Sequence, residues 1–354
     1  IEEVQANLDE DTQVITYFLG EESLFSFNIT KDSISLLRAD IADKLVSSTN
    51  DFKNHLSQRD NIDELSYDLF MYLLGQQLDR EKKNLIIVAD NVLNYIPFEV
   101  LRSPDGSLVI EKHSVSYNGS VRIFLELKKS FFKYDAPQDW AGFAPTYSEK
   151  EVLPSSIQEV NEIARLTDGV EFIGASAKKK NFIDYNKEFS IMHFAMHAKI
   201  DNENPLYNRL LFEDGELTAS EIYTSNAKAN LVVLSACNTG FGKIEKGEGV
   251  MSMARAFHYS GIPSVLMSLW KVPDQETKTI MIDFYRYLKK GKSKSEALRM
   301  AKLSYLDKND NGELAHPYYW SGFVINGNMD PLEINKTNFP IAWIVFTIIG
   351  ILIL

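Results

Sequence analysis

Residues 231–240 decide the fold of this chain, and they read Leu231-Val232-Val233-Leu234-Ser235-Ala236-Cys237-Asn238-Thr239-Gly240. An apolar run that ends at a cysteine and opens into a glycine-bearing turn predicts a buried strand with a thiol at its carboxyl end. Open α/β sheets place their chemistry at that edge. A second apolar run, residues 190–198, carries His197 near its end, 40 residues before Cys237.

Cys237 is the only cysteine of the chain, and a lone cysteine in an apolar strand most often just fills space. Its position argues against that role, because it is the last residue before the turn. His197 similarly ends its run and precedes the polar loop 201–205. A cysteine and a histidine at the ends of two strands are the minimum set for a thiol nucleophile and its general base.

The rest of the chain predicts an α/β protein. Residues 11–41 alternate apolar and polar side chains, which indicates a hairpin or a meander, and 84–90 form a mostly apolar strand. Residues 61–83 have helical spacing, and 106–118 suggest a hairpin. After a linker at 133–140, strand and helix patterns alternate to about residue 306, which predicts a parallel sheet.

Further motifs follow the cysteine in order along the chain. They are Gly247-Glu248-Gly249-Val250, Ala254-Arg255-Ala256-Phe257, Gly261-Ile262-Pro263-Ser264-Val265, Ser268-Leu269-Trp270-Lys271-Val272-Pro273-Asp274 and His316-Pro317-Tyr318-Tyr319-Trp320-Ser321-Gly322-Phe323. Together with residues 12–18 and 96–101, this ordered set resembles the CHAT domain, a caspase-like family of clan CD cysteine peptidases related to separase.

The resemblance implies a caspase-like, parallel-rich sheet flanked by helices. It divides the chain into an N-terminal non-catalytic, pseudo-caspase-like half at 1–135 and a catalytic half at 136–329. After these halves, the sequence itself predicts a linker at 330–338 and a C-terminal hydrophobic helix at 339–354. The resemblance also implies an upstream sensor, because helical repeats often precede this domain.

The expected catalytic residues are His197 and Cys237. A neighbouring imidazole takes the thiol proton and returns it to the leaving amine. The backbone N–H of Cys237 is the first expected oxyanion donor. The resemblance implies a second donor from the residue after the histidine, which is usually Gly in this family and is Ala198 here.

Trp270 and Asp274 follow the apolar strand predicted after Cys237. Both are candidates for the substrate pocket, where an acid would favour a basic side chain of the substrate. The alternative is that Trp270 belongs to the core and Asp274 caps a helix from Gln275. His193 and His197 do not form a zinc motif, because Phe194 stands where a zincin has Glu. We therefore expect no metal, and His193 as a core histidine.

Composition narrows the partners. The 354 residues include 37 basic and 49 acidic ones, so the net charge of −12 disfavours direct nucleic-acid binding. The glycines after Cys237 lack dinucleotide or Walker A spacing, so no cofactor is expected. One cysteine cannot form an internal disulfide, which favours a reducing compartment.

Residues 339–354 carry no charge and suggest a transmembrane helix, although 16 residues span only about 24 Å of a hydrocarbon core of ~30 Å. The alternative is a buried core helix. The resulting expectation is a membrane-anchored protein with a cytoplasmic catalytic domain.

Two functions compete. The first is a cysteine endopeptidase that cleaves a specific protein substrate and is switched on by the upstream sensor. The second is an inactive CHAT scaffold that binds protein partners. Retention of both His197 and Cys237 favours the enzyme.

Overall fold

One large sheet runs through the protein. The computed structural model describes residues 1–129, 134–147, 153–201, 203–235, 243–245, 249–251, 253–310 and 312–334. Within them, eleven strands form the sheet in the spatial order β3-β2-β1-β4-β5-β16-β15-β12-β8-β6-β7. In chain order these strands are β1 (Thr12–Leu19), β2 (Leu24–Ile29), β3 (Ile34–Ala39), β4 (Asn84–Val88), β5 (Ser114–Tyr117), β6 (Gln138–Ala144), β7 (Val170–Ile173), β8 (Phe189–Phe194), β12 (Leu231–Leu234), β15 (Ser264–Ser268) and β16 (Phe323–Gly327).

The sheet consists of two parallel blocks. Strands β1, β4, β5 and β16 run parallel to one another, and so do β15, β12, β8, β6 and β7. The two blocks meet at the antiparallel pair β15–β16, so they run in opposite directions. β2 and β3 add an antiparallel meander beside β1, as predicted for residues 11–41.

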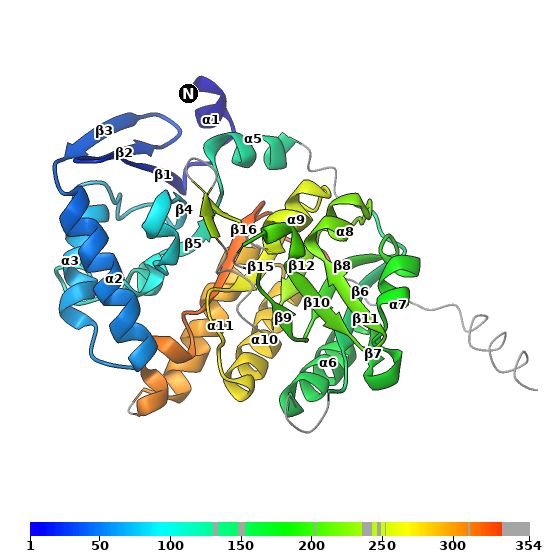
Figure 1. Ribbon diagram of the computed structural model, residues 1–354. Coiled ribbons are helices and arrows are strands. Elements are labelled where there is room, and N and C mark those ends of the chain that lie inside the picture. The colour runs from blue at the N-terminus through cyan, green and yellow to red at the C-terminus, as the bar shows by residue number, and fades with distance from the viewer. Residues whose placement is uncertain are drawn as a thin grey trace, which may run out of the picture.

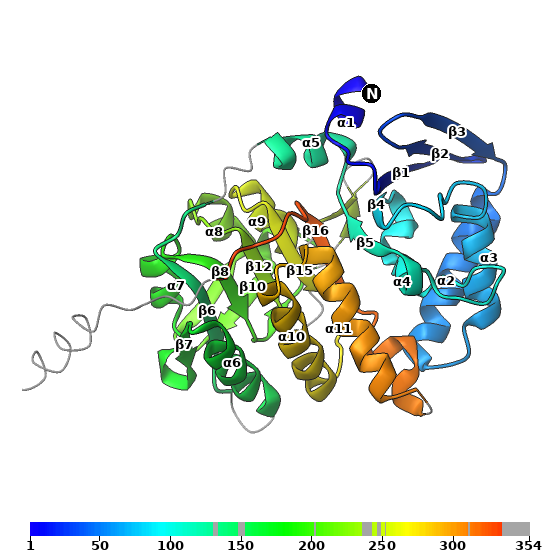
Figure 2. The same cartoon turned by 180° about the vertical axis from the view of Figure 1, so that it is seen from behind.

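Helices cover both faces of this sheet (Figures 1 and 2). One face is covered by α2 (Ala42–Gln58), α3 (Asp63–Leu73), α6 (Pro154–Thr167), α10 (Asp274–Lys289) and α11 (Lys294–Lys308). The other is covered by α1 (Glu2–Ala6), α5 (Val121–Lys129), α7 (Lys179–Tyr185), α8 (Ala219–Thr224) and α9 (Met253–Tyr259).

Strand alternation assigns side chains to the two cores. On β8, Ile191 lies in the core under α6 and α10, whereas Met192 and Phe194 lie in the core under α7, α8 and α9. β12 repeats the pattern, since its four residues are all buried and alternate between the same cores. Burial on both faces explains the continuous apolar runs of these strands.

Smaller elements lie near the central strands. β9 (Ala198–Lys199), β10 (Arg209–Phe212) and β11 (Gly215–Thr218) form an antiparallel sheet in the order β11-β10-β9. The hairpin of β13 (Lys243–Glu245) and β14 (Gly249–Met251) lies against the 3-10 helix η1 (Asn91–Tyr95).

A buried ion pair joins the N-terminal and C-terminal parts. Lys302 of α11 donates to a carboxylate oxygen of Glu99, and the other oxygen accepts the hydroxyl of Tyr117 at 2.6 Å. Both charged side chains are at most 5% exposed. Burial lowers the pKa of Lys302, and the neighbouring carboxylate of Glu99 opposes this effect.

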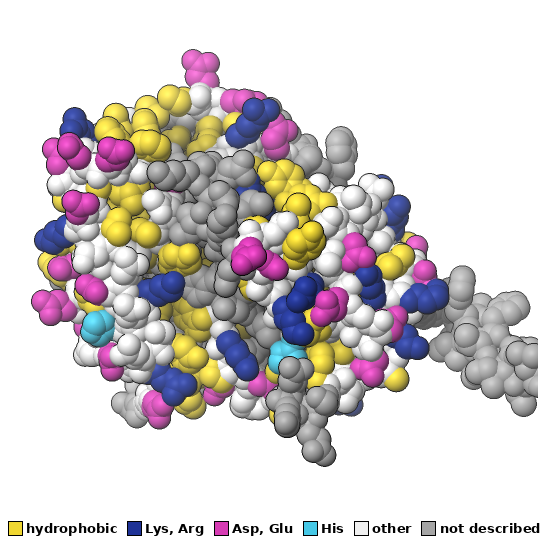
Figure 3. All heavy atoms as spheres, in the orientation of Figure 1, with side chains coloured by type: hydrophobic (Ala, Val, Ile, Leu, Met, Phe, Trp, Pro, Cys, Tyr) yellow, Lys and Arg dark blue, Asp and Glu magenta, His cyan; other side chains and the backbone are white. Residues whose placement is uncertain are grey.

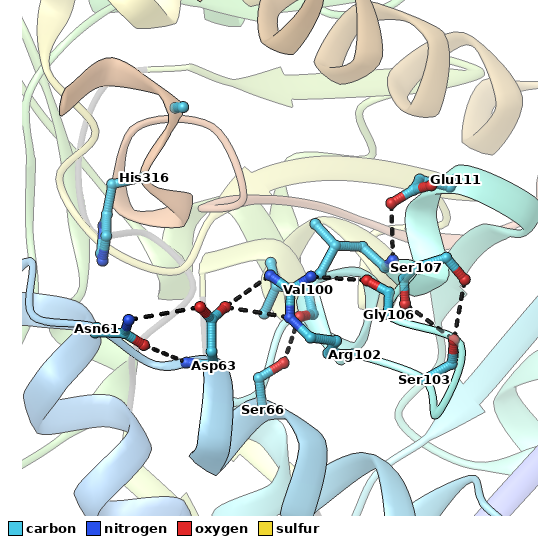
Figure 4. Close-up of polar contacts among 12 residues, drawn as sticks. Asn61, Asp63, Ser66, Val100, Arg102, Ser103, Gly106, Ser107, Glu111 and His316 are labelled. Atoms are coloured by element: carbon cyan, nitrogen blue, oxygen red, sulfur yellow. Dashed lines mark hydrogen bonds and ion pairs between the residues drawn. The ribbon is translucent and has the colours of Figure 1, made fainter. Parts of the chain in front are cut away.

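The motif that begins at His316 makes a second junction. Nδ1 of His316 accepts the N–H of Tyr318, while Nε2 lies 2.9 Å from the carbonyl oxygen of Asp60, just before α3. At the start of α3, Asp63 pairs with Arg102 at 2.6 Å (Figure 4). The motif therefore connects the 3-10 turn at Pro317–Tyr319 to the segment just before α3.

The outer end of the sheet is exposed. β3 is its edge strand, with Ile34 and Leu36 exposed at 42% and 57%. Phe18 of β1 and Phe27 of β2 are also exposed, and apolar side chains gather over this end of the molecule (Figure 3, upper left).

Two predictions of structure are wrong. Residues 106–118 are not a hairpin, because a short helix, α4 (Val109–Lys112), precedes β5. The predicted membrane anchor and membrane-anchored localisation are also contradicted, since no helix in the described ranges is long and apolar enough to cross a bilayer. Residues 339–354 lie outside those ranges, and 16 helical residues would rise only about 24 Å.

Candidate functional site

The register of β8 and β12 places the two predicted catalytic residues at matching positions along the chain. The strands are parallel neighbours, and Phe194 and Leu234 are partners at their carboxyl ends. His197 is three residues past Phe194, and Cys237 is three residues past Leu234. Cys237 lies outside the described residues, so its contacts with His197 are not described. Both strands end earlier than predicted from their apolar runs.

The backbone of His197 is held by a residue that the sequence analysis missed. The hydroxyl of Tyr147 accepts the N–H of His197 at 2.9 Å and donates to the carbonyl of Leu211 at 2.8 Å. The N–H of Leu211 in turn donates to the carbonyl of His197. The Tyr147 hydroxyl thus bridges the N–H of His197 and the carbonyl of Leu211.

The rings of Tyr147 and His197 lie 4.5 Å apart, and the imidazole is half-buried. Tyr147 lies three residues past the end of β6, another parallel neighbour of β8. A search for polar side chains just beyond each apolar strand could therefore have found it.

Ala198 begins β9, opposite Leu210 of β10. The carbonyl of the preceding residue, His197, accepts the N–H of Leu211 in β10. Because backbone groups of successive residues in an antiparallel ladder point to opposite sides, the N–H of Ala198 points away from β10. The φ angle of Ala198 is not positive. Alanine in place of the usual glycine thus introduces no backbone strain here.

Trp270 and Asp274 follow β15, the parallel neighbour of β12. The indole N–H of Trp270 donates to the carbonyl of Tyr318 at 2.8 Å, and the two rings stack. Asp274 is the first residue of α10, and its carboxylate accepts the N–H of Ser155 at 2.7 Å. Both side chains are only partly buried.

His193 has different surroundings from His197. It is fully buried; its Nε2 lies 2.7 Å from a carboxylate oxygen of Glu159, and its Nδ1 lies 3.1 Å from the Tyr285 hydroxyl. Burial raises the pKa of Tyr285 well above its usual range. His193 is therefore a hydrogen-bonded core histidine, as predicted. In the ranges that the structure covers, no group of three or more His, Cys, Asp or Glu side chains could hold a metal ion.

The fold and the positions at the ends of β8 and β12 define a class: an α/β protein with a largely parallel sheet whose edge carries a histidine, with a cysteine at the matching chain position. The model of the CHAT domain family matches residues 62–328. This chain belongs to the CHAT domain family.

Two curated relatives match parts of the chain. The chain is 24% identical to human tetratricopeptide repeat protein 28 over 300 residues, which is 70% of this chain and 12% of that protein. It is 32% identical to the mouse protein of the same name over 113 residues, which is 32% of this chain and 4% of that protein. The chain thus spans a small fraction of the length of these relatives.

Among solved structures, a chain of the Saccharomyces cerevisiae separase–securin complex is similar in fold. The TM-score is 0.61 at 11% sequence identity, over 92% of this chain and 30% of that chain. At this identity the likeness concerns the fold alone: a caspase-like arrangement of a mostly parallel sheet between helices.

Proposed function

We propose that this domain is a cysteine endopeptidase in which Cys237 is the nucleophile and His197 the general base and acid. The observation that carries the proposal is the register of β8 and β12, since both residues follow paired strand ends at the same offset. Family membership and the caspase-like fold support it.

The proposed reaction has two steps. His197 takes the thiol proton, and the thiolate of Cys237 attacks the scissile carbonyl carbon. The C–N bond then breaks as the imidazolium returns the proton to the leaving amine. Water, deprotonated by the same imidazole, hydrolyses the resulting thioester, which releases the acid and restores the thiol.

Backbone donors would stabilise the negative oxygen of each tetrahedral intermediate. The N–H of Ala198 points away from β10, and we propose it as the second donor, in addition to the N–H of Cys237. Tyr147 is the proposed positioning residue, because its hydroxyl holds the backbone at His197.

Trp270 and Asp274 remain candidates for the substrate pocket. Their contacts with Tyr318 and Ser155 are also those of a junction between β15, α6 and α10. A carboxylate at Asp274 would favour a basic side chain before the scissile bond.

The upstream region is the proposed activator. The matched human relative is named for tetratricopeptide repeats, which are helical pairs that stack into extended binding surfaces. We propose that such repeats precede this domain in the full protein and control its activity. The same observation favours the competing function, a scaffold that holds partners and cleaves nothing.

One experiment separates the two functions. Full-length protein, activated by a partner that binds its upstream repeats, is treated with a biotinylated peptidyl acyloxymethyl ketone that ends in Arg. New N-termini in the proteome are analysed in parallel. The wild type should be labelled and generate new N-termini. Cys237→Ala and His197→Ala should lose at least 1,000-fold in turnover.

His193→Phe serves as the matched control, because it replaces a nearby histidine that lies in the core and has no proposed catalytic role. It should retain labelling wherever the protein folds. If activated Cys237→Ala cleaves as the wild type does, the peptidase proposal is wrong and the scaffold takes its place.

A further inference from the structure

A cavity of about 210 Å³ lies between α5 and α9. Its floor is formed by β4, β5, β15 and β16, and α5 comes from the N-terminal part of the chain while α9 comes from the C-terminal part. We call it the α5–α9 cavity. Among the described residues, neither β8 nor β12 contributes to its lining.

Two asparagine side chains that line this cavity carry buried polar atoms without hydrogen-bond partners in the described part of the chain. Asn118, which follows β5, is 5% exposed, and neither its Oδ1 nor its Nδ2 has a partner in the part of the chain that the structure describes. The Nδ2 of Asn326 on β16 has none either. Buried amides are nearly always paired, so unpaired ones that line a cavity indicate a ligand or ordered water.

The remaining lining is mostly apolar. Ile123 and Leu127 come from α5, Ala254 from α9, and Met267 from β15. Glu126 and Arg255 contribute one charge of each sign. Nδ1 of His258 lies 2.9 Å from the carbonyl of Ile262, and burial lowers the pKa of this imidazole to about 4, so it is neutral at pH 7. The lining thus favours neither an anion nor a cation.

We propose that the α5–α9 cavity binds a small neutral molecule with an amide-like edge, a donor beside an acceptor, on an apolar body. Asn118 offers one acceptor and one donor side by side, which match the N–H and C=O of a carboxamide or lactam. Asn326 adds a second donor for the same carbonyl. The apolar body would lie against Leu127 and Met267.

The size agrees with this ligand class. An apolar cavity of about 150 Å³ accommodates benzene in a well-packed protein. A cavity of about 210 Å³ therefore has room for a six-membered ring with a carboxamide group. Because the walls come from both parts of the chain, such a ligand would contact α5 and α9 at once.

Benzamide is a suitable probe, with acetophenone as its matched control, because a methyl group there replaces the amide NH₂. The whole chain is labelled with ¹³C-methyl methionine, and the Met267 signal is assigned by its loss in Met267→Leu. Titration with benzamide should move this signal to saturation. Acetophenone should bind about tenfold more weakly, since it leaves the Asn118 acceptor unpaired.

Two variants test the role of the amides. Asn118→Leu should abolish the preference for benzamide, and Asn118→Ala should do the same if the larger side chain disturbs the fold. Asn208→Leu is the matched control: Asn208 is 1% exposed with an unpartnered Nδ2 but lies outside the cavity lining. It should leave the benzamide Kd unchanged within about twofold.

Several outcomes would overturn the proposal. If benzamide produces no saturable shift at Met267, the cavity holds only water. If benzamide and acetophenone bind equally in the wild type, the site recognises shape and not an amide edge. The inference does not depend on the peptidase proposal, because Cys237 takes no part in any of these measurements.

Discussion

Two histidines four residues apart serve different purposes because their side chains lie in different surroundings. His193 is enclosed between Glu159 and Tyr285, whereas His197 is half-buried beside Tyr147 at the end of the strand. Sequence spacing alone invites a shared metal site. The structure directs Nε2 of His193 to the Glu159 carboxylate, which explains its burial.

Replacing His193 should therefore affect stability. His193→Ala leaves the buried carboxylate of Glu159 without its imidazole partner, and the free energy of unfolding should fall by about 3 kcal/mol. Urea denaturation followed by far-UV circular dichroism measures this. His197→Ala is the control and should change the free energy by less than about 1 kcal/mol. Equal losses in both variants would contradict the core assignment of His193.

Lys294, the first residue of α11, predicts a pH dependence of stability. It is fully buried and donates to the backbone carbonyls of Asn328 and Asp330. Burial lowers its pKa to about 7, which the Asp330 carboxylate opposes and the Lys128 ammonium reinforces. The unfolded chain therefore binds more protons than the folded one between pH 7 and about 10.5.

The contribution of Lys294 to the free energy of unfolding should rise with pH between pH 7 and about 10.5, and it should be lowest below pH 7. The free energy of unfolding of the wild type, relative to that of Lys294→Met, should increase by up to about 1.4 kcal/mol per pH unit. Urea titrations from pH 6 to 10 measure the difference. A flat difference would show that Lys294 remains charged in the folded protein.

Local sequence revealed some residues of the site and not others. His197 and Cys237 were predicted as catalytic residues because each stands just beyond an apolar run, and their catalytic role stays a prediction. Tyr147 also stands just beyond an apolar strand, but its contact with His197 joins residues 50 positions apart, so local pattern did not reveal which backbone it holds. The junctions made by Trp270 and Asp274 likewise depend on tertiary contacts with Tyr318 and Ser155.

At the scale of elements, α11 connects the two parts of the chain. Its Lys302 reaches Glu99, and its Arg299 donates to the carbonyl of Ile110 at 2.7 Å, so both contacts lead into the N-terminal part. A buried ion pair need not stabilise a fold overall, but removing one partner leaves an unpaired buried charge.

Lys302→Met should accordingly lower the free energy of unfolding by about 3–5 kcal/mol, because the Glu99 carboxylate would lose its cation. The double variant Glu99→Leu with Lys302→Met should recover at least half of that loss. Chemical denaturation of the two single variants and the double variant gives the coupling energy. A double variant as unstable as the sum of the singles would argue against direct coupling.

Element boundaries followed the sequence where periodicity was strong. The alternating strand and helix patterns predicted up to about residue 306 correspond, in their last part, to β15, α10 and α11. Helix α2 was missed, although Leu45, Phe52 and Leu56 are its buried face. The helix α4 was mistaken for a strand, because four residues are too few to establish a helical period.

For the whole molecule, the continuous sheet means that the two proposed halves should fold as one unit. Division near residue 135 would separate β5 from β16 and expose their shared core. Residues 136–329 expressed alone should aggregate or give broad, poorly dispersed NMR signals, whereas the whole chain should not. A well-folded fragment that melts like the whole chain would contradict this.

The exposed edge at β3 has a consequence for behaviour in concentrated solution. An unpaired strand edge beside apolar side chains is a template for another edge, and like charge is what holds two copies apart. The chain carries a net charge of −12 at pH 7, which shrinks as carboxylates take up protons toward about pH 5. The second virial coefficient from light scattering should therefore turn from repulsive to attractive over that interval, and Leu36→Lys should weaken the attraction by placing a charge on the edge itself.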